Sequence, residues 1–242
     1  MSIVSPPVPQ EQGARSVYSE ECLETMRRWR GIDAKPDPEN RRKKNGIRIF
    51  RSKLMEIGLT KSPWYVPWLL TIPIMAGGIW WGYSHGLAAW QLGLGFVLGM
   101  LLWTLLEYLL HRWLFHYTPK SESLKAFFFL THGYHHEFPD DPMRLVAPPL
   151  MYWGLASFFA LLFLAAFGRV WWGPLYAGMM GGYLFYDSVH FYVHHARPTS
   201  GVGKFLRSYH LLHHFDDHDT RYGISTPLWD FVFRTYRPIG KK

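Results

Sequence analysis

The sequence predicts an all-α integral membrane protein: four transmembrane helices in two hairpins, with a histidine-rich helical cap on the cytosolic side. Three observations predict this fold: four long apolar segments, two very short links within pairs of them, and an uneven distribution of Lys and Arg. The 242 residues include a single cysteine, which excludes a disulfide-rich fold. Hydrophobic residues make up 48% of the chain, which excludes a disordered protein.

The four apolar segments are each long enough to cross a bilayer as a helix. About 20 helical residues span the hydrocarbon layer, and each segment has that length or slightly more. None shows the alternation of apolar and polar residues that is typical of strands. We therefore predict membrane-spanning helices over residues 64–83, 87–110, 148–167 and 170–193.

The links and the basic residues predict how these helices are oriented. The first pair is joined by Ser84-His85-Gly86 and the second by Gly168-Arg169, so each pair forms a hairpin. Of the 26 Lys and Arg residues, 13 precede residue 64, four lie in 111–147 and eight follow residue 193. Because basic residues stay on the cytoplasmic side, both termini and the middle loop are expected there. The net charge of +8 is thus typical of a multi-pass membrane protein, and nucleic acid is not expected as a partner.

Histidine is the unusual residue of this chain, with 13 copies. Four groups of them lie at or beyond the cytoplasmic ends of predicted spans, so the topology collects them at one membrane face. Imidazole is a common ligand of zinc, iron, copper and nickel. About ten converging histidines exceed the four ligands of one tetrahedral site, which favours two neighbouring metal ions. His85 lies alone on the opposite side, and we expect a structural role for it.

Two carboxylates lie inside the apolar segments, Glu107 one turn before His111 and Asp187 just before His190. Acidic residues in membrane spans are costly and usually functional. Carboxylates near ligating histidines commonly accept the N–H of the other ring nitrogen. We predict this supporting role for both; the alternative is an interfacial carboxylate that is solvated or paired with Arg112 or another basic residue.

These motifs resemble the histidine boxes of the fatty acid hydroxylase / sterol desaturase superfamily, and most closely those of the fatty acid 2-hydroxylases. The segments that carry the resemblance are Glu107-Tyr-Leu-Leu-His-Arg-Trp-Leu-Phe-His116, His132-Gly-Tyr-His-His136 with Arg144-Leu-Val-Ala-Pro-Pro149, Tyr186-Asp-Ser-Val-His-Phe-Tyr-Val-His194, and Tyr209-His-Leu-Leu-His-His-Phe215 with Leu228-Trp-Asp230.

The resemblance implies O2-dependent hydroxylation of the alkyl chain of a fatty acid or fatty-acyl lipid, at carbon 2, with O2 as co-substrate. It implies two metal ions, which we expect to be iron in the active enzyme, with zinc possible in isolated protein. His195 and His218 have no counterpart in the motifs, and His195 points away from His190 if the helix stays regular. The implied ligands are His111, His116, His132, His135, His136, His190, His194, His210, His213 and His214.

The resemblance also implies a domain organisation. Residues 47–238 would form the membrane di-metal hydroxylase domain, preceded by a basic, loosely ordered cytosolic segment (1–46) and followed by a basic tail (239–242). We expect one short helix in that first segment, around residues 20–30. The segment is too short for the cytochrome b5 domain that eukaryotic members often carry. A separate electron-donor protein is therefore expected. The missing domain also indicates a bacterial member of the family, so this protein is expected in a bacterial inner membrane rather than in the endoplasmic reticulum.

Two alternatives remain open at this point. The same metal core could hydroxylate a carotenoid or sterol, or act as a desaturase. A non-enzymatic alternative is a metal-binding membrane transporter. Transporters place their ligands near the membrane midplane in broken helices, whereas these histidines lie at helix ends.

Overall fold

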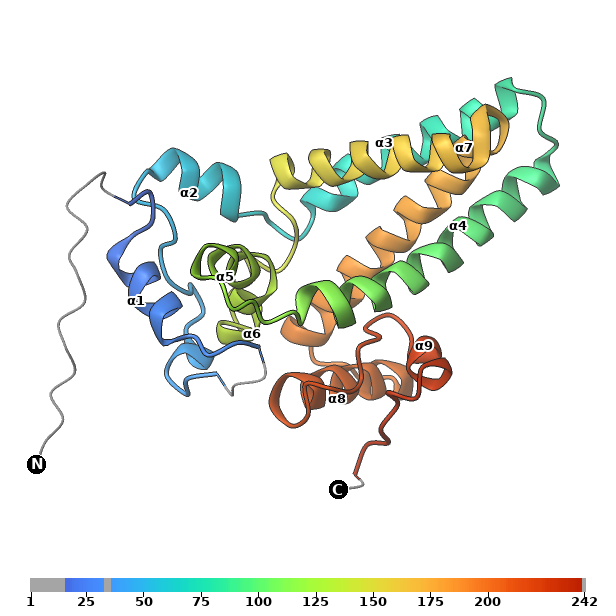
Figure 1. Cartoon of the computed structure of the whole chain (residues 1–242). Coiled ribbons are helices and arrows are strands. Elements are labelled where there is room, and N and C mark those ends of the chain that lie inside the picture. Colours follow the sequence, from blue (N-terminus) through green and yellow to red (C-terminus); the bar gives the residue numbers. More distant parts are fainter. Residues whose placement is uncertain (1–15, 33–35, 241–242) are drawn as a thin grey trace, which may run out of the picture.

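The computed structural model describes residues 16–32 and 36–240, and within these ranges the chain is helical, with only an isolated bridge between Tyr18 and Phe50 in place of a sheet (Figure 1). Its elements, in chain order, are α1 (Glu20–Arg28), η1 (Asn40–Arg42), α2 (Lys53–Thr60), α3 (Val66–Ser84), α4 (Ala89–Leu109), η2 (Leu110–Phe115), α5 (Glu122–Phe128), η3 (Phe129–Gly133), α6 (Tyr134–Glu137), α7 (Pro149–His195), α8 (Gly201–Phe215) and α9 (Leu228–Val232).

The three longest helices form the two predicted hairpins. The first, α3 and α4, turns at Gly86, whose φ of 87° suits glycine. The second lies within α7, which reverses at Gly168 (φ 68°, ψ 173°), so that α7 consists of two antiparallel arms (Figure 1). Two helical stretches, Ala89–Phe115 and Pro149–His195, are long and apolar enough to cross a membrane.

Small residues let the second arm of α7 approach α3 and α4 closely. A Cβ atom on Gly99 of α4 would lie 2.1 Å from the Leu175 carbonyl oxygen. On α7, a Cβ atom on Gly178 would lie 2.0 Å from the Phe96 carbonyl oxygen. Such backbone-to-backbone contact is typical of packed membrane helices, which lack a hydrophobic driving force for association. This packing determines where the two arms of α7 end relative to α4.

The short helices form a cap at one end of these hairpins, and the described N-terminal residues belong to it. Cys22 and Met26 of α1 and Trp29 directly after it are buried with Phe129 and Phe138, in a core separate from that of the long helices. The structure thus confirms the predicted short helix, and it packs residues 16–32 more firmly than the loosely ordered segment we expected. Residues 1–15 of that segment lie outside the described residues.

The close approach of α4 and α7 predicts a position-specific effect of added methyl groups. We expect Gly99→Ala to destabilise the protein by about 1–3 kcal/mol, because its Cβ atom overlaps backbone atoms of α7. Gly93→Ala on the same helix is the control, since a Cβ atom there meets nothing within 4 Å. Melting temperatures of the detergent-solubilised variants measure the difference; equal values for the two would contradict this packing.

Candidate metal centre

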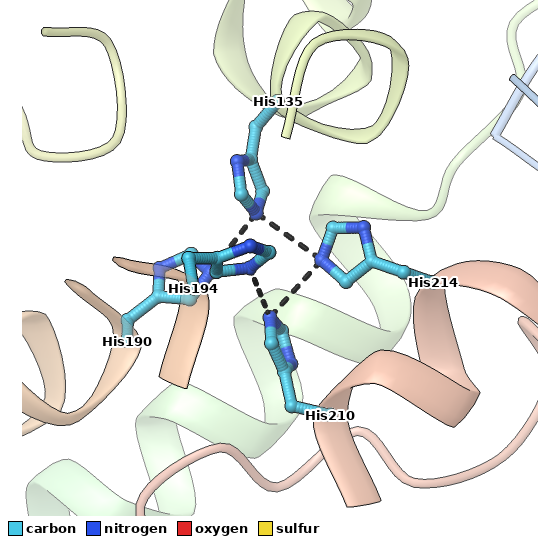
Figure 2. A group of neighbouring side chains, drawn as sticks. All are labelled: His135, His190, His194, His210 and His214. Atoms are coloured by element: carbon cyan, nitrogen blue, oxygen red, sulfur yellow. Dashed lines mark hydrogen bonds between the residues drawn. The ribbon is translucent and has the colours of Figure 1, made fainter. Parts of the chain in front are cut away.

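Five buried histidines from α6, α7 and α8 meet in one group (Figure 2). His135 comes from α6, His190 and His194 end α7, and His210 and His214 belong to α8. Their candidate ligand nitrogens all lie within 4.8 Å of one another. The Nε2–Nε2 contacts are His190–His135 at 3.0 Å, His135–His214 at 3.1 Å, His214–His210 at 3.0 Å and His210–His194 at 2.8 Å. We call this the five-histidine group.

Protons alone do not satisfy this five-histidine group. Each nitrogen of a neutral imidazole carries either one proton or one lone pair. A nitrogen that contacts two others can therefore form a hydrogen bond with only one of them. The four contacts run through five nitrogens as a chain, which leaves room for at most two hydrogen bonds. A cation bound by all five lone pairs removes the conflict. Metal–nitrogen bonds of about 2.1 Å place neighbouring ligand nitrogens about 3.0–3.4 Å apart, which matches this spacing.

Four more histidines form a second group beside the first. The four-histidine group contains His111 of η2, His116 directly after η2, His132 of η3 and His136 of α6. The Nε2 atoms of His132 and His136 lie 3.1 Å apart. His213 borders the group, with its Nε2 3.0 Å from that of His116.

A π-helical turn brings His111 and His116 together. Five residues along an α-helix correspond to a rotation of about 140° beyond one full turn, which points the two rings apart. Here α4 continues into η2, where the His116 N–H donates to the His111 carbonyl oxygen at 3.2 Å, the i to i+5 bond of a π-helix. His132 also lies in a π-helical turn, η3. Such turns are frequent at functional sites.

Sequence neighbours are divided between the two groups. His135 belongs to the five-histidine group and His136 to the four-histidine group, because consecutive residues on a helix point about 100° apart. His213 and His214 are divided in the same way. The rings of His136 and His214 stack with centroids 4.0 Å apart. The two groups therefore adjoin, as a dinuclear centre requires.

A loop over residues 220–226, the orienting loop, holds two of the rings. The carbonyl oxygen of Tyr222 lies 2.5 Å from His111 Nδ1, and that of Thr220 lies 2.8 Å from His213 Nδ1. Since a carbonyl oxygen only accepts, both rings carry their proton on Nδ1 and keep the Nε2 lone pair. This hydrogen bond from the second ring nitrogen is typical of metal-ligating histidines.

Glu107 holds the orienting loop, and this corrects the expected contact with a histidine. One carboxylate oxygen accepts hydrogen bonds from the N–H groups of Ile224 at 2.8 Å and Ser225 at 2.9 Å, and the other accepts from the Ser225 hydroxyl. Asp230 of α9 accepts from the N–H groups of Tyr222 and Gly223. Glu107 thus supports His111 through the loop carbonyl rather than through its ring.

Asp187 is buried one turn before His190, as its place in the sequence predicts. Among the described residues, it makes no hydrogen bond to a histidine ring. The ring of Tyr186 next to it lies 5.6 Å from that of His190. The supporting role predicted for Asp187 therefore stays a prediction.

Arg207 of α8 joins the histidines of α7 to those of α8. Its guanidinium donates to the carbonyl oxygens of Val193, His194 and Ala196, at 3.1 Å for the last two. These carbonyls end α7 and have no partner further along the helix. The Arg207 guanidinium thus caps α7 next to His194 and holds α8 at a fixed distance from α7.

The environment of these histidines keeps them neutral and able to bind a cation. Burial, reinforced by the neighbouring imidazoles, holds the pKa of each of these side chains well below its usual value: His132, His135, His136, His210 and His214. A neutral ring keeps a lone pair, so the all-imidazole donor set fits zinc or iron.

Besides His213, which borders the four-histidine group, three histidines lie outside both groups. His195 is half-buried, with its ring 4.7 Å from that of Phe191, and His85 stacks on Trp81 at the far end of α3. His218, which has no counterpart in the family motifs, is buried, and its ring centroid lies 5.7 Å from that of His136. Its position four residues after His214 is the signal that could have placed it near the centre.

Comparisons with known proteins agree with this geometry. The family model described as "Fatty acid hydroxylase" matches residues 96–235, which contain every histidine of both groups. The chain belongs to the fatty acid hydroxylase family. This confirms the family that the histidine motifs predicted.

Relatives of this fatty acid hydroxylase are similar over most of its length. A dihydroceramide fatty acyl 2-hydroxylase of Arabidopsis thaliana is 38% identical over 197 residues, which are 78% of this chain and 80% of the relative. The fatty acid 2-hydroxylase of Rattus norvegicus is 36% identical over 79% of this chain and 57% of its own length. The solved structure of full-length scs7p, with only the hydroxylase domain visible, superposes with a TM-score of 0.74 at 33% identity, over 79% of this chain and 73% of that one.

The five-histidine group predicts different outcomes for the adjacent residues His194 and His195. We expect His194→Ala to lose one metal ion of the two and nearly all turnover, because a ligand of the group is removed. We expect His195→Ala to keep both ions and much of the activity, since its ring lies outside both groups. Elemental analysis of the purified variants tests this. Equal loss in the two variants would show that the ligand assignment on α7 is incorrect.

The orienting loop predicts an effect of Glu107 on a metal that it does not touch. We expect Glu107→Ala to weaken metal binding about 10- to 100-fold, the usual effect of removing support behind a ligand. Glu107→Gln should fall between Ala and the wild type, because its amide oxygen can still accept from the loop N–H groups. Competition with a chelator measures the affinities. Binding of wild-type strength in the Ala variant would rule out this support.

Proposed function

We propose that this hydroxylase adds a hydroxyl group to carbon 2 of the acyl chain of a fatty acid or fatty-acyl lipid, using O2 at a di-metal centre. The observation that carries the proposal is the pair of adjoining, all-imidazole groups in a member of this family. The names of the relatives favour an acyl 2-hydroxylase over a carotenoid or sterol hydroxylase or a desaturase. The proposed ligands are His111, His116, His132, His135, His136, His190, His194, His210, His213 and His214.

The reaction consumes the C–H bond of the substrate, O2, two electrons and two protons, and it gives the C–OH product and water. When bound, the metal ions supply the binding and reductive activation of O2. We propose iron for the active enzyme, because an open imidazole site that reacts with oxygen is typical of iron. Zinc can occupy the same site in isolated protein, since it binds imidazole at least as well as ferrous iron. A separate protein is proposed as the electron donor.

The chain itself contributes positioning, burial and neutral ligands. Arg207 and the orienting loop fix α7, α8 and the rings of His111 and His213 relative to one another. The burial of both groups limits the access of water to the oxidant, which prevents wasteful side reactions. Because the centre lies where the long helices end, an acyl chain can enter from the bilayer while its polar end stays outside.

We propose that α3, α4 and the two arms of α7 are four membrane spans, with the cap and both termini in the cytoplasm. The Lys and Arg distribution supports this side, and the apolar side chains exposed along these helices support their contact with lipid. Residues 47–238 would form the hydroxylase domain, between the basic segments 1–46 and 239–242. The transporter alternative is disfavoured, because both groups lie at the ends of the long helices.

Lipid analysis in a host that lacks 2-hydroxy lipids tests the reaction. We expect acyl chains that gain one oxygen atom at carbon 2 and take it from labelled O2, because a monooxygenase transfers one oxygen atom of O2 to its substrate. His194→Ala should give none, while His195→Ala should give product. Chains that lose two hydrogens instead would indicate a desaturase. Metal flux in proteoliposomes without any lipid oxidation would indicate a transporter.

A further inference from the structure

Two short helices of the cap have their polar side inside and their apolar side outside. On α2, Glu56 is only 5% exposed, whereas Leu54 and Ile57 are 83% and 53% exposed. On α9, Asp230 is fully buried, whereas Phe231 and Val232 are each 57% exposed. A helix on the surface of a water-soluble protein shows the opposite arrangement, with its apolar stripe facing the core.

Buried hydrogen bonds fix this orientation of α2. The Glu56 carboxylate accepts from the N–H groups of Ile49 at 2.9 Å and Phe50 at 2.8 Å, and it forms a buried ion pair with Arg144. A rotation of α2 that buried Leu54 would break these bonds. Because an unpaired buried charge costs several kcal/mol, the outward position of the apolar side chains is enforced.

The orientation of α9 is fixed in the same way. Asp230 accepts from the N–H groups of Tyr222 and Gly223, and from the Thr235 hydroxyl at 2.7 Å. Trp229 Nε1 donates to Thr104 of α4 at 3.0 Å, which ties α9 to the long helices. The exposed side chains of both helices follow helical spacing, Leu54 with Ile57 and Leu228 with Phe231 and Val232.

Both helices lie where the long helices join the cap (Figure 1). A short segment containing Trp64 and Tyr65, both about half exposed, leads from α2 into α3. Exposed Trp and Tyr side chains at this level are typical of the membrane interface. Lys53 begins α2 and Lys61 directly follows it, and side chains of this length can extend their ammonium groups to lipid phosphates.

We propose that α2 and α9 are interfacial helices, whose apolar faces lie among the lipid headgroups and upper acyl chains of the same leaflet that faces the cap. This inference rests on the four-span topology proposed above. The lipid bilayer is the occupant because these apolar faces continue the lipid-exposed surface of the spans. Helices of this kind bury their apolar face about 5–10 Å into the boundary between headgroups and acyl chains.

The same contacts link the two interfacial helices to the metal centre. Arg144, the partner of Glu56, also donates to the Tyr134 hydroxyl at 2.9 Å, and Tyr134 lies between His132 and His135. On the other side, Asp230 of α9 holds the loop that orients His111. The contact of both helices with the membrane thereby fixes the position of the metal centre relative to the lipid headgroups.

Site-specific fluorescence quenching tests the proposal on the full chain in lipid nanodiscs. Cys22 can be retained, since it is fully buried and burial raises the pKa of its thiol to about 12. Single cysteines replace Leu54, Ile57, Phe231 or Val232 and carry a thiol-reactive fluorophore. Arg27→Cys on the exposed side of α1 is the aqueous control, and Leu101→Cys on α4 is the lipid-facing reference.

We expect brominated phospholipids to quench all four labels roughly twofold or more beyond the Arg27 control, as burial at the interface requires. Aqueous iodide should show the reverse order. If the labels on either helix are quenched no more by brominated lipid than the Arg27 control, the proposal is overturned. Labels that neither quencher reaches would also overturn it, because they would indicate a protein partner. The readout needs no turnover, so a failed hydroxylation assay leaves this result intact. The topology is tested separately: labelling of Lys242 in whole cells by an amine reagent that cannot cross the membrane would contradict it.

Discussion

Every other feature of this structure depends on one constraint: the imidazoles must stay buried, neutral and aimed inward. A buried polar group without a partner costs about 1–3 kcal/mol, so a cluster of this size is expensive unless a cation satisfies it. The orienting loop and Arg207 hold rings and helices in place through hydrogen bonds that involve no ion. Glu107 and Asp230 contribute to this support, because their carboxylates accept hydrogen bonds from backbone N–H groups of the orienting loop.

The long helices and the two histidine groups form one mechanical unit. α4 ends in the four-histidine group and α7 ends in the five-histidine group, so the contact of these two helices sets the distance between the groups. Glycines such as Gly99 and Gly178 make that contact a backbone contact, which flexible side chains cannot loosen. The packing of α4 against α7 therefore determines how the two histidine groups lie relative to each other.

The distribution of polarity in the cap follows from the same surroundings. In water, α2 and α9 would turn Leu54 and Phe231 inward, but here buried carboxylates occupy the inner sides. A bilayer makes this arrangement favourable, because it removes the cost of exposing apolar side chains and leaves the interior free for polar bonds. The cap can therefore bring polar support to the histidines and still lie against lipid.

The sequence by itself determined the helical hairpins, the four histidine boxes and their convergence, because apolar length, short links and charge bias are local properties that the bilayer enforces. It also separated His194 from His195, since α-helical spacing suffices there. Only the tertiary structure decided how neighbours such as His135 and His136 divide between two groups, how η2 turns His116, and that Glu107 bonds a loop 117 residues away. These features depend on contacts between segments far apart in the chain, and no local pattern encodes them.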